Sequence, residues 1–376
     1  MSTLELLEEG LVPTPGKRIR RGGLHALTGI RFFAAIWVVL FHFGAAFTAR
    51  AHMPHPVTVF LEHGDLGVSL FFMLSGFILY YTYQDNLKSS RDLYKFFVAR
   101  VARLYPVYLL AIIIAIPLHH HLPRGVELLI FPLVQSWTLP TSDIGYSWII
   151  QAWTLSVEAF FYCCFPVFLL LFRRKWTASL LWTLVTGLVA LNVALGVPLF
   201  HPLMPNAWLT SHFILPVLCL PEFLLGMVLG ALFLRKQRLN PSSSTNDWVT
   251  GAGILACCAL IAAGVGDTLV CLAAVVCFGW AIYRLADGRG WLTNLLSSKV
   301  MLLLGGASYS IYLLQGLIRE SARRTIAKFH PGLDAALSPV ILICLSCLIF
   351  LFFEEPLRDV VRKILLRQPT SSRVVA

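Results

Sequence analysis

Charge is scarce in this chain. Only 13% of its residues are charged, 57% are hydrophobic, and the mean hydropathy is +0.75. Soluble domains carry roughly 25% charged residues, so this composition excludes a soluble globular fold. The alternating ten-residue pattern of a transmembrane barrel is also missing. Because helices then remain the only way to satisfy backbone groups in lipid, the sequence predicts an all-α, polytopic transmembrane helical bundle.

Other absences narrow the class further. The chain has no heptads and no convincing internal repeat. Its net charge of +11 comes from short basic clusters between apolar runs, as in cytoplasmic loops of membrane proteins, so no nucleic-acid partner is expected. The nine cysteines all lie inside apolar segments. We therefore expect packing thiols, with neither a disulfide framework nor a metal site.

The apolar windows predict about ten spans. Their expected bounds are 24–48, 65–84, 104–118, 147–172, 176–197, 213–234, 248–265, 268–286, 300–318 and 336–353. A further apolar stretch, 127–140, is interrupted by Pro132 and Pro140. It is interpreted as a re-entrant or interfacial piece.

The basic residues orient these spans. With a cytoplasmic N-terminus, the inner segments hold 23 of the 30 Lys and Arg residues and the outer segments hold six. The positive-inside bias therefore predicts that both termini are cytoplasmic. The predicted organisation is a cytoplasmic tail at 1–23, a membrane domain at 24–353 and a second cytoplasmic tail at 354–376.

Two ionisable residues lie on the first span, where charge is costly and suggests function. Arg31 and His42 are eleven positions apart, which places both on one helix face about 16 Å apart along the axis. Arg31 near the cytoplasmic mouth has the geometry to bind phosphate. His42, deeper in the membrane, can accept a proton from a hydroxyl. The alternative is a snorkelling arginine and a packing histidine.

Glu158 is a third charge within a span, in the segment WTLSVEAFFY. Ser156 is two positions away and points elsewhere, which argues against a Ser–Glu catalytic pair. Glu158 is interpreted as a group that orients or balances a histidine from another helix; a structural pair with Arg31 is the alternative.

Arg100 and Arg103 lie three positions apart at the cytoplasmic entry of the third span. Two guanidinium groups at this spacing form a fork of the size of a phosphate. Taken alone, the pair is also typical of ordinary positive-inside charge.

Together these segments resemble the acyltransferase-3 family of integral membrane O-acyltransferases, and the stand-alone, exopolysaccharide-modifying members most of all. The resemblance covers nearly the whole span-bearing region. It rests on six blocks in the family's order: Arg31 to His42, GVSLFFMLSGFIL (Gly67 to Leu79), RVARLYPVY, WTLSVE (Trp153 to Glu158), SYSIYLL (Ser308 to Leu314) and EPLR (Glu355 to Arg358).

This resemblance implies O-acylation, with O-acetylation expected, from cytoplasmic acyl-CoA (acetyl-CoA) to a hydroxyl of a glycan. The expected acceptor is an exopolysaccharide or a lipid-linked repeat unit. His42, with Glu158, is the implied catalytic pair, and Arg31, Arg100 and Arg103 are the implied donor-site residues. The implied location is the bacterial cytoplasmic membrane, among lipids and other polysaccharide-assembly proteins. Gln315 stands where many relatives have a histidine, so a mechanism that needs a second histidine there is not expected and the catalytic role is assigned to His42.

Arg319, Arg323 and Arg324 lie on the predicted outer side, against the charge bias. They are interpreted as substrate-binding residues for an acidic glycan or a lipid-linked diphosphate; the alternatives are contact with lipid headgroups or a wrong topology for the ninth span. His119, His120 and His121 form an outer triplet without a nearby carboxylate or cysteine, so no metal is expected there.

Two questions stay open at this point. The residues do not separate direct transfer from a relay in which His42 carries the acyl group. A transporter or flippase of a glycolipid or acyl donor, with or without transfer chemistry, would also show about ten spans. Such proteins usually contain repeated halves and broken helices, which this sequence does not show.

Overall fold

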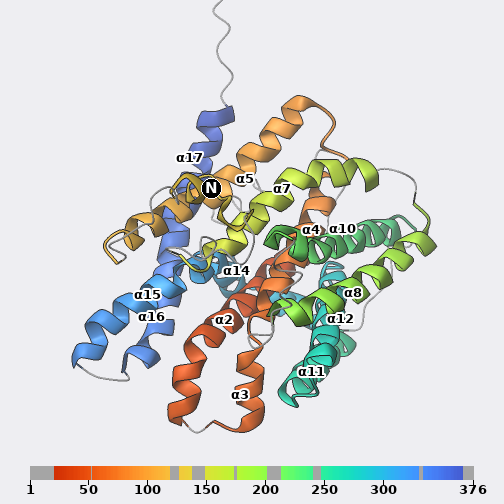
Figure 1. Ribbon diagram of the computed structural model, residues 1–376. Coiled ribbons are helices and arrows are strands. Elements are labelled where there is room, and N and C mark those ends of the chain that lie inside the picture. Colours follow the sequence, from red (N-terminus) through yellow and green to blue (C-terminus); the bar gives the residue numbers. More distant parts are fainter. Residues whose placement is uncertain are drawn as a thin grey trace, which may run out of the picture.

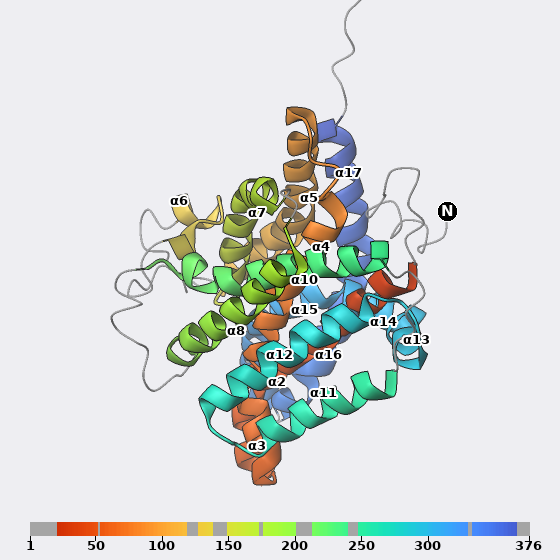
Figure 2. The same ribbon diagram turned by 90° about the vertical axis from the view of Figure 1, so that its right-hand side faces the viewer.

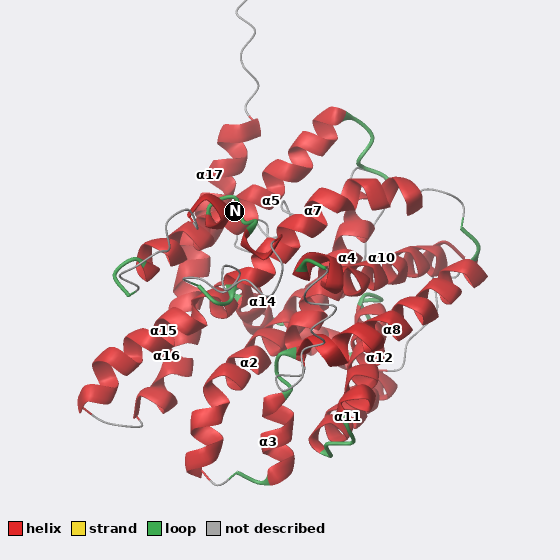
Figure 3. Ribbon diagram, viewed as in Figure 1, coloured by secondary structure: helices red, strands yellow, loops and turns green. Residues whose placement is uncertain are grey.

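The computed structural model describes residues 21–51, 53–118, 127–137, 149–172, 176–200, 213–239, 247–329 and 333–366. Within these residues the chain forms helices, turns and loops, and no strand (Figure 3). The all-α prediction is therefore confirmed for the described part of the chain.

The long helices follow the predicted spans. They are α2 (Arg21–Ala51), α4 (Leu66–Tyr83), α5 (Ser90–Ala115), α7 (Ala152–Phe172), α8 (Ala178–Phe200), α10 (Leu215–Leu239), α11 (Asp247–Ala262), α12 (Asp267–Leu285), α15 (Ser308–Phe329) and α16 (Leu333–Ile349). Shorter elements are α3 (His55–Glu62), α6 (Glu127–Ile130), a 3-10 turn at Gln135–Trp137, α13 (Trp291–Leu296), α14 (Lys299–Gly306), a π-helical turn at Phe350–Glu354 and α17 (Glu355–Leu366).

Eight of the described helices are long and apolar enough to cross a membrane. A ninth span results if α14 and α15, bent by 53° at their junction, are counted together. The shorter apolar helix α11 coincides with the remaining predicted segment. The chain is thus an integral membrane protein by its helices, while ten spans and two cytoplasmic termini stay predictions.

Three predicted boundaries differ clearly from the structure. The ninth predicted span ends at 318, whereas α15 continues to Phe329, and the tenth ends at 353, whereas the candidate span extends from Leu337 to Leu366. The largest difference is at the third span. The third span was expected at 104–118, but α5 begins at Ser90. The reason is a capping box: the Ser89 side chain accepts from the Asp92 backbone N–H, and the Asp92 carboxylate accepts from the Ser89 backbone N–H. The cap starts the helix well before the apolar run, so Arg100 and Arg103 lie in the middle of a continuous helix.

Helix α2 is central, because it packs against α4, α13, α14 and α15. Helices α5 and α17 reach past one end of the bundle, and α3 lies at the other (Figures 1 and 2). One close helix crossing joins α4 and α10. A Cβ atom added at Gly76 would lie 2.0 Å from the Phe223 carbonyl oxygen, and one at Gly226 would lie 2.0 Å from that of Met73. Only glycine permits this approach.

The stretch expected to be re-entrant or interfacial is described up to Trp137 and packs against α5 and α7. Side chains of the neighbouring helices satisfy backbone groups of this stretch that have no helical partner. The Tyr108 hydroxyl donates to the Ile130 carbonyl, and the Ser156 hydroxyl accepts from the Ser136 N–H. The indole of Trp137 donates to the Ser156 carbonyl. Irregular backbone is tolerated in lipid only when protein satisfies it in this way.

Candidate active site

Three helices bring their charged side chains to one internal cavity. Arg31 of α2, Arg100 and Arg103 of α5, and Glu158 of α7 all line it. The cavity offers about 30 Å³ of space that a water molecule can occupy, and an adjoining one of about 40 Å³ shares Arg31, Arg103 and Glu158 with it. The residues predicted for the donor site therefore do come together in space.

Glu158 is held by two hydroxyl donors. Ser75 of α4 donates to Oε1 and Tyr162, one turn along α7, donates to Oε2, both at 3.0 Å. A carboxylate inside a bundle needs such donors or a nearby cation, and Glu158 has both, because it shares the cavity with Arg31 and Arg103. The negative charge is thereby fixed at the cavity wall.

Arg100 differs from its neighbour Arg103 in its surroundings. Its guanidinium carbon lies 5.6–5.8 Å from the ring centroids of Tyr83, Phe96 and Tyr162. These are cation–π distances, and a weak bond of 3.4 Å to the Tyr83 hydroxyl is added. Its Nε is buried and has no hydrogen-bond partner. Arg100 is thus enclosed by aromatic rings while it still lines the cavity.

The adjoining cavity extends toward α15. Ser308, Tyr309 and Tyr312 of that helix line it, together with Thr154 of α7. The Tyr309 hydroxyl donates to the carbonyl of Leu104 at 2.7 Å, which ties α15 to α5 directly beside Arg103. Helix α15 is therefore the second wall of the charged centre.

His42 lies further along α2 and is half-buried. Its Nδ1 is 2.9 Å from the carbonyl oxygen of Val38. Because a carbonyl oxygen only accepts, Nδ1 carries the proton in this bond and Nε2 keeps its lone pair. Arg319 of α15 donates to the backbone oxygen of His42 and covers the ring of Phe43. This tautomer suits a general base.

The structure separates His42 from Glu158. Neither of the two cavities includes His42, and the Glu158 oxygens are occupied by Ser75 and Tyr162. Glu158 was expected to balance a His42 imidazolium directly, but the structure shows no contact between the two side chains. A catalytic role of Glu158 stays a prediction. Arg31 shares a cavity with residues of α15, and the backbone oxygen of His42 accepts a hydrogen bond from Arg319 of the same helix.

Gln315 lies between the two sites on α15. It is fully buried, its amide nitrogen donates to the Tyr312 carbonyl, and its Oε1 has no hydrogen-bond partner. Being four residues before Arg319 and three after Tyr312, it shares their helix face. Gln315 thus keeps one unused acceptor inside the bundle, although it lines neither cavity.

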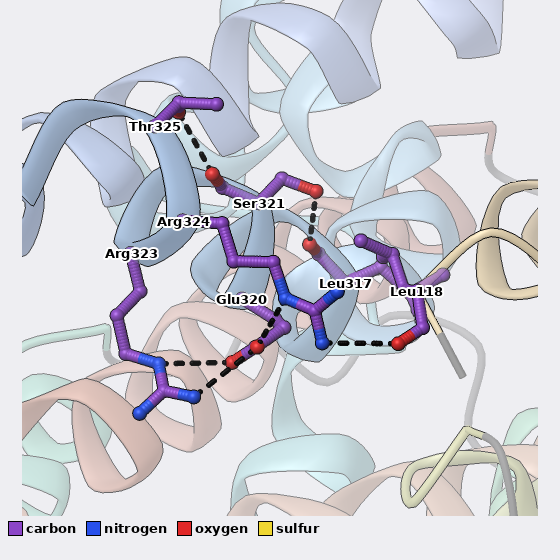
Figure 4. Close-up of polar contacts among 7 residues, drawn as sticks. All are labelled: Leu118, Leu317, Glu320, Ser321, Arg323, Arg324 and Thr325. Atoms are coloured by element: carbon purple, nitrogen blue, oxygen red, sulfur yellow. Dashed lines mark hydrogen bonds and ion pairs between the residues drawn. The ribbon is translucent and has the colours of Figure 1, made fainter. Parts of the chain in front are cut away.

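The three arginines predicted to bind substrate, Arg319, Arg323 and Arg324, do not act as one group; Figure 4 shows the contacts of Arg323 and Arg324. Arg323 and Arg324 both pair with Glu320, at 3.0 and 2.6 Å. Arg324 also donates to the carbonyl of Leu118 at the end of α5. Only Arg319 is at His42. The sequence interpretation overlooked Glu320, whose i+3 and i+4 spacing to the arginines was the available signal.

The sequence also missed other residues of the charged centre, among them Ser75, Tyr162 and Glu354. The signal for Ser75 and Tyr162 was weak, because hydroxyl residues are common in membrane helices.

The histidine triplet 119–121 lies outside the described residues. All nine cysteines are free thiols; three of them are buried, whereas Cys163 and Cys344 are exposed on the bundle.

The protein combines an apolar helical bundle, a buried arginine–glutamate centre and a histidine that can act as a base. These features are those of a membrane acyltransferase, and the family match agrees with them. The model of the acyltransferase-3 family, described as "Acyltransferase domain", matches residues 24–354. The chain therefore belongs to this family, as its sequence blocks predicted.

Individual relatives agree with this assignment. The chain is 31% identical over 331 residues to "Acyltransferase MdmB" of Streptomyces mycarofaciens, covering 80% of each chain. It is 28% identical to "Peptidoglycan O-acetyltransferase OatA" of Listeria monocytogenes over 49% of this chain and 30% of that one. It is 30% identical to "Exopolysaccharide production protein ExoZ" of Rhizobium meliloti over 52% and 56%. No solved structure matches the chain.

Proposed function

We propose that this acyltransferase moves an acetyl group from cytoplasmic acetyl-CoA to a hydroxyl of a glycan. The acceptor we propose is an exopolysaccharide or a lipid-linked repeat unit, modified in the bacterial cytoplasmic membrane beside other polysaccharide-assembly proteins. The names of two relatives, a peptidoglycan O-acetyltransferase and an exopolysaccharide production protein, support a glycan acceptor.

The proposal that acetyl-CoA is the donor rests on the excess of positive charge among the residues that line the internal cavity. Three guanidinium groups, those of Arg31, Arg100 and Arg103, meet one carboxylate in the cavity lining. An excess of positive charge in a low-dielectric interior is costly unless an anion completes it. The diphosphate of a CoA molecule is such an anion, and arginine binds phosphate oxygens in pairs.

The cavities are small for this ligand, since about 30 and 40 Å³ hold only a few water molecules. Donor binding therefore has to displace side chains. Arginine is suited to this, because its long flexible stem lets the guanidinium follow a ligand. The thioester would then approach His42 along the face of α15 that carries Tyr312 and Gln315.

His42 would supply the proton chemistry. Its Nε2 lone pair takes the proton of the acceptor hydroxyl, whose oxygen forms a bond to the thioester carbonyl carbon. The carbon–sulfur bond then breaks, CoA leaves as the thiolate, and the imidazolium returns the proton to that sulfur. The products are the acetyl ester of the acceptor and the free CoA thiol. An acyl relay through the same Nε2 would give the same products in two steps.

Binding of acetyl-CoA to the purified protein in nanodiscs, followed by release of free CoA with a glycan acceptor, tests the proposal. Arg103→Gln should lose donor affinity about tenfold or more, as expected for a charge-assisted phosphate contact. The matched control is Arg284→Gln, which removes an arginine of α12 that lies over Trp280 and outside both cavities. Equal binding in all three proteins would overturn the donor site, and glycolipid movement without CoA release would favour a flippase.

A further inference from the structure

The last membrane helix is interrupted by a π-helical turn at Phe350–Glu354, between α16 and α17. Such turns are rare and often occur at functional sites, because the wider turn redirects the side chains that follow it. Phe352 in this turn is 76% exposed, whereas Glu354 at its end is only 5% exposed. The turn therefore points a carboxylate into the bundle.

Glu354 is held there by α15. The Ser310 hydroxyl, itself fully buried, donates to Glu354 Oε2 at 2.9 Å. The neighbouring Tyr309 hydroxyl donates to the Leu104 carbonyl of α5, and the π-helical turn packs against α5. These contacts place Glu354 where α15 and α5 meet, next to the position of Arg103.

The charges around Glu354 are those of the internal cavity. Arg103 and Arg31 both act electrostatically on its carboxylate, as does Arg358. In turn, Glu354 and Glu158 are the two carboxylates that act on Arg31 and on Arg103. Arg31 and Arg103 also repel each other. Two like charges that share a cavity inside the bundle are costly unless counter-charges lie near them.

We propose that Glu354, held by Ser310 at the junction of α15 and α5, is a positioning residue for the donor site that helps Glu158 keep the Arg31 and Arg103 guanidinium groups at the cavity. The inference rests on the proposed function, because the arginines are taken to bind the phosphates of acyl-CoA. Glu354 touches neither cavity itself, so it acts through the arginines.

The next residue provides a matched control. Glu355 is equally buried, 5% exposed, and begins α17. Its Oε1 lies 3.6 Å from Arg358 Nη2, and Arg358 and Asp359 are the charges that act on it. Glu355→Gln thus removes a buried carboxylate one position away whose own charge partners are Arg358 and Asp359 and include neither Arg31 nor Arg103.

The experiment compares two donors. Steady-state kinetics are measured with acetyl-CoA and with acetyl-pantetheine, which carries the same thioester but no phosphate. In Glu354→Gln the KM for acetyl-CoA should rise about tenfold, the effect of one lost charge-assisted interaction, with little change in kcat. The kinetics with acetyl-pantetheine should not change, and Glu354→Asp should restore part of the affinity for acetyl-CoA. Glu355→Gln should behave as wild type with both donors.

The outcomes are separable. If wild type does not use acetyl-CoA, the proposed function fails. If wild type uses it and Glu354→Gln has an unchanged KM, or loses activity equally with both donors, the positioning role fails. Should Glu354→Gln not fold, Ser310→Ala decides: a KM for acetyl-CoA raised about two- to threefold by the lost hydrogen bond supports the role, and an unchanged KM refutes it.

Discussion

The Nδ1 atom of His42 lies 2.9 Å from the carbonyl oxygen of Val38, four residues earlier on α2. This contact determines which ring nitrogen carries the proton, because a carbonyl can only accept. It leaves Nε2 free to act as a base. Orientation of a histidine by the partner of its other nitrogen is a general feature of histidine sites.

Substitution of His42 by Gln should therefore lower the rate of acyl transfer about 10²- to 10⁴-fold, the usual effect of losing a general base. Binding of acetyl-CoA should be retained, because His42 lines neither cavity. Single-turnover transfer and donor binding are the measurements.

His63 provides the control for that change, since its Nδ1 lies 2.8 Å from the Val59 carbonyl in the same i, i−4 geometry. His63→Gln should keep normal activity. A His42→Gln enzyme with the wild-type rate would remove His42 from the mechanism.

Substitutions of Arg319 and Arg323 should differ. Arg323 has a side chain that is 69% exposed and pairs with Glu320, and exposed ion pairs contribute little, so Arg323→Gln should leave transfer within about twofold. Arg319 donates to the His42 backbone oxygen, so Arg319→Gln should lower kcat/KM for the acceptor about tenfold. Acceptor titration at fixed acetyl-CoA measures both. Equal losses in the two variants would favour a general electrostatic role of this surface.

Replacement of Ser156 by Ala should affect stability and spare chemistry. Ser156 is fully buried and accepts the Ser136 N–H at 3.1 Å. The variant leaves that donor unsatisfied, at a cost of about 1–3 kcal/mol, so the midpoint of thermal unfolding should fall. Thr186→Ala on α8 loses an exposed bond to the Trp182 carbonyl and should unfold near the wild-type temperature. A large loss of kcat in well-folded Ser156→Ala would instead assign the serine to the reaction.

Alanine at Gly76 should disrupt the α4–α10 crossing. Its Cβ atom would lie 2.0 Å from the Phe223 carbonyl oxygen, so the helices would have to separate, at a cost of about 1–3 kcal/mol or more. Gly187 on α8 has no atom within 4 Å of such a Cβ, and alanine there should be neutral or slightly stabilising. Yield of folded protein and thermal unfolding distinguish the two. Wild-type stability of Gly76→Ala would show that the crossing is looser than the structure has it.

Much of the fold could be predicted from the sequence because lipid imposes a strong rule on every span. About 20 apolar residues are needed for each crossing, and all ten predicted segments coincide with apolar helices. The start of α5 could not be found by hydropathy, since Ser90 to Arg103 is a polar helical extension that depends on the cap at Ser89 and Asp92.

The site was only partly predictable. Arg31 and Glu158 were expected because a charge within a span is rare and costly, whereas Arg100 and Arg103 were expected from their spacing and the family resemblance. The structure gathers all four in one cavity. Glu354 was assigned to the cytoplasmic tail, because it follows the last apolar run. The π-helical turn that brings it into the bundle leaves no mark in the hydropathy pattern.

Resemblance to the sequence blocks of the acyltransferase-3 family indicated the activity. The sequence by itself determined that this protein is a helical membrane protein and which charged residues it keeps within its spans. Both follow from local rules: the apolar length of each segment and the cost of an isolated charge in lipid. Tertiary structure alone decided that Glu158 faces the arginines and does not contact His42, that Arg319 differs from Arg323 and Arg324, and that Glu354 points inward. Those relationships depend on which helix faces meet, and a helix face carries no record in the sequence of the neighbour that will cover it.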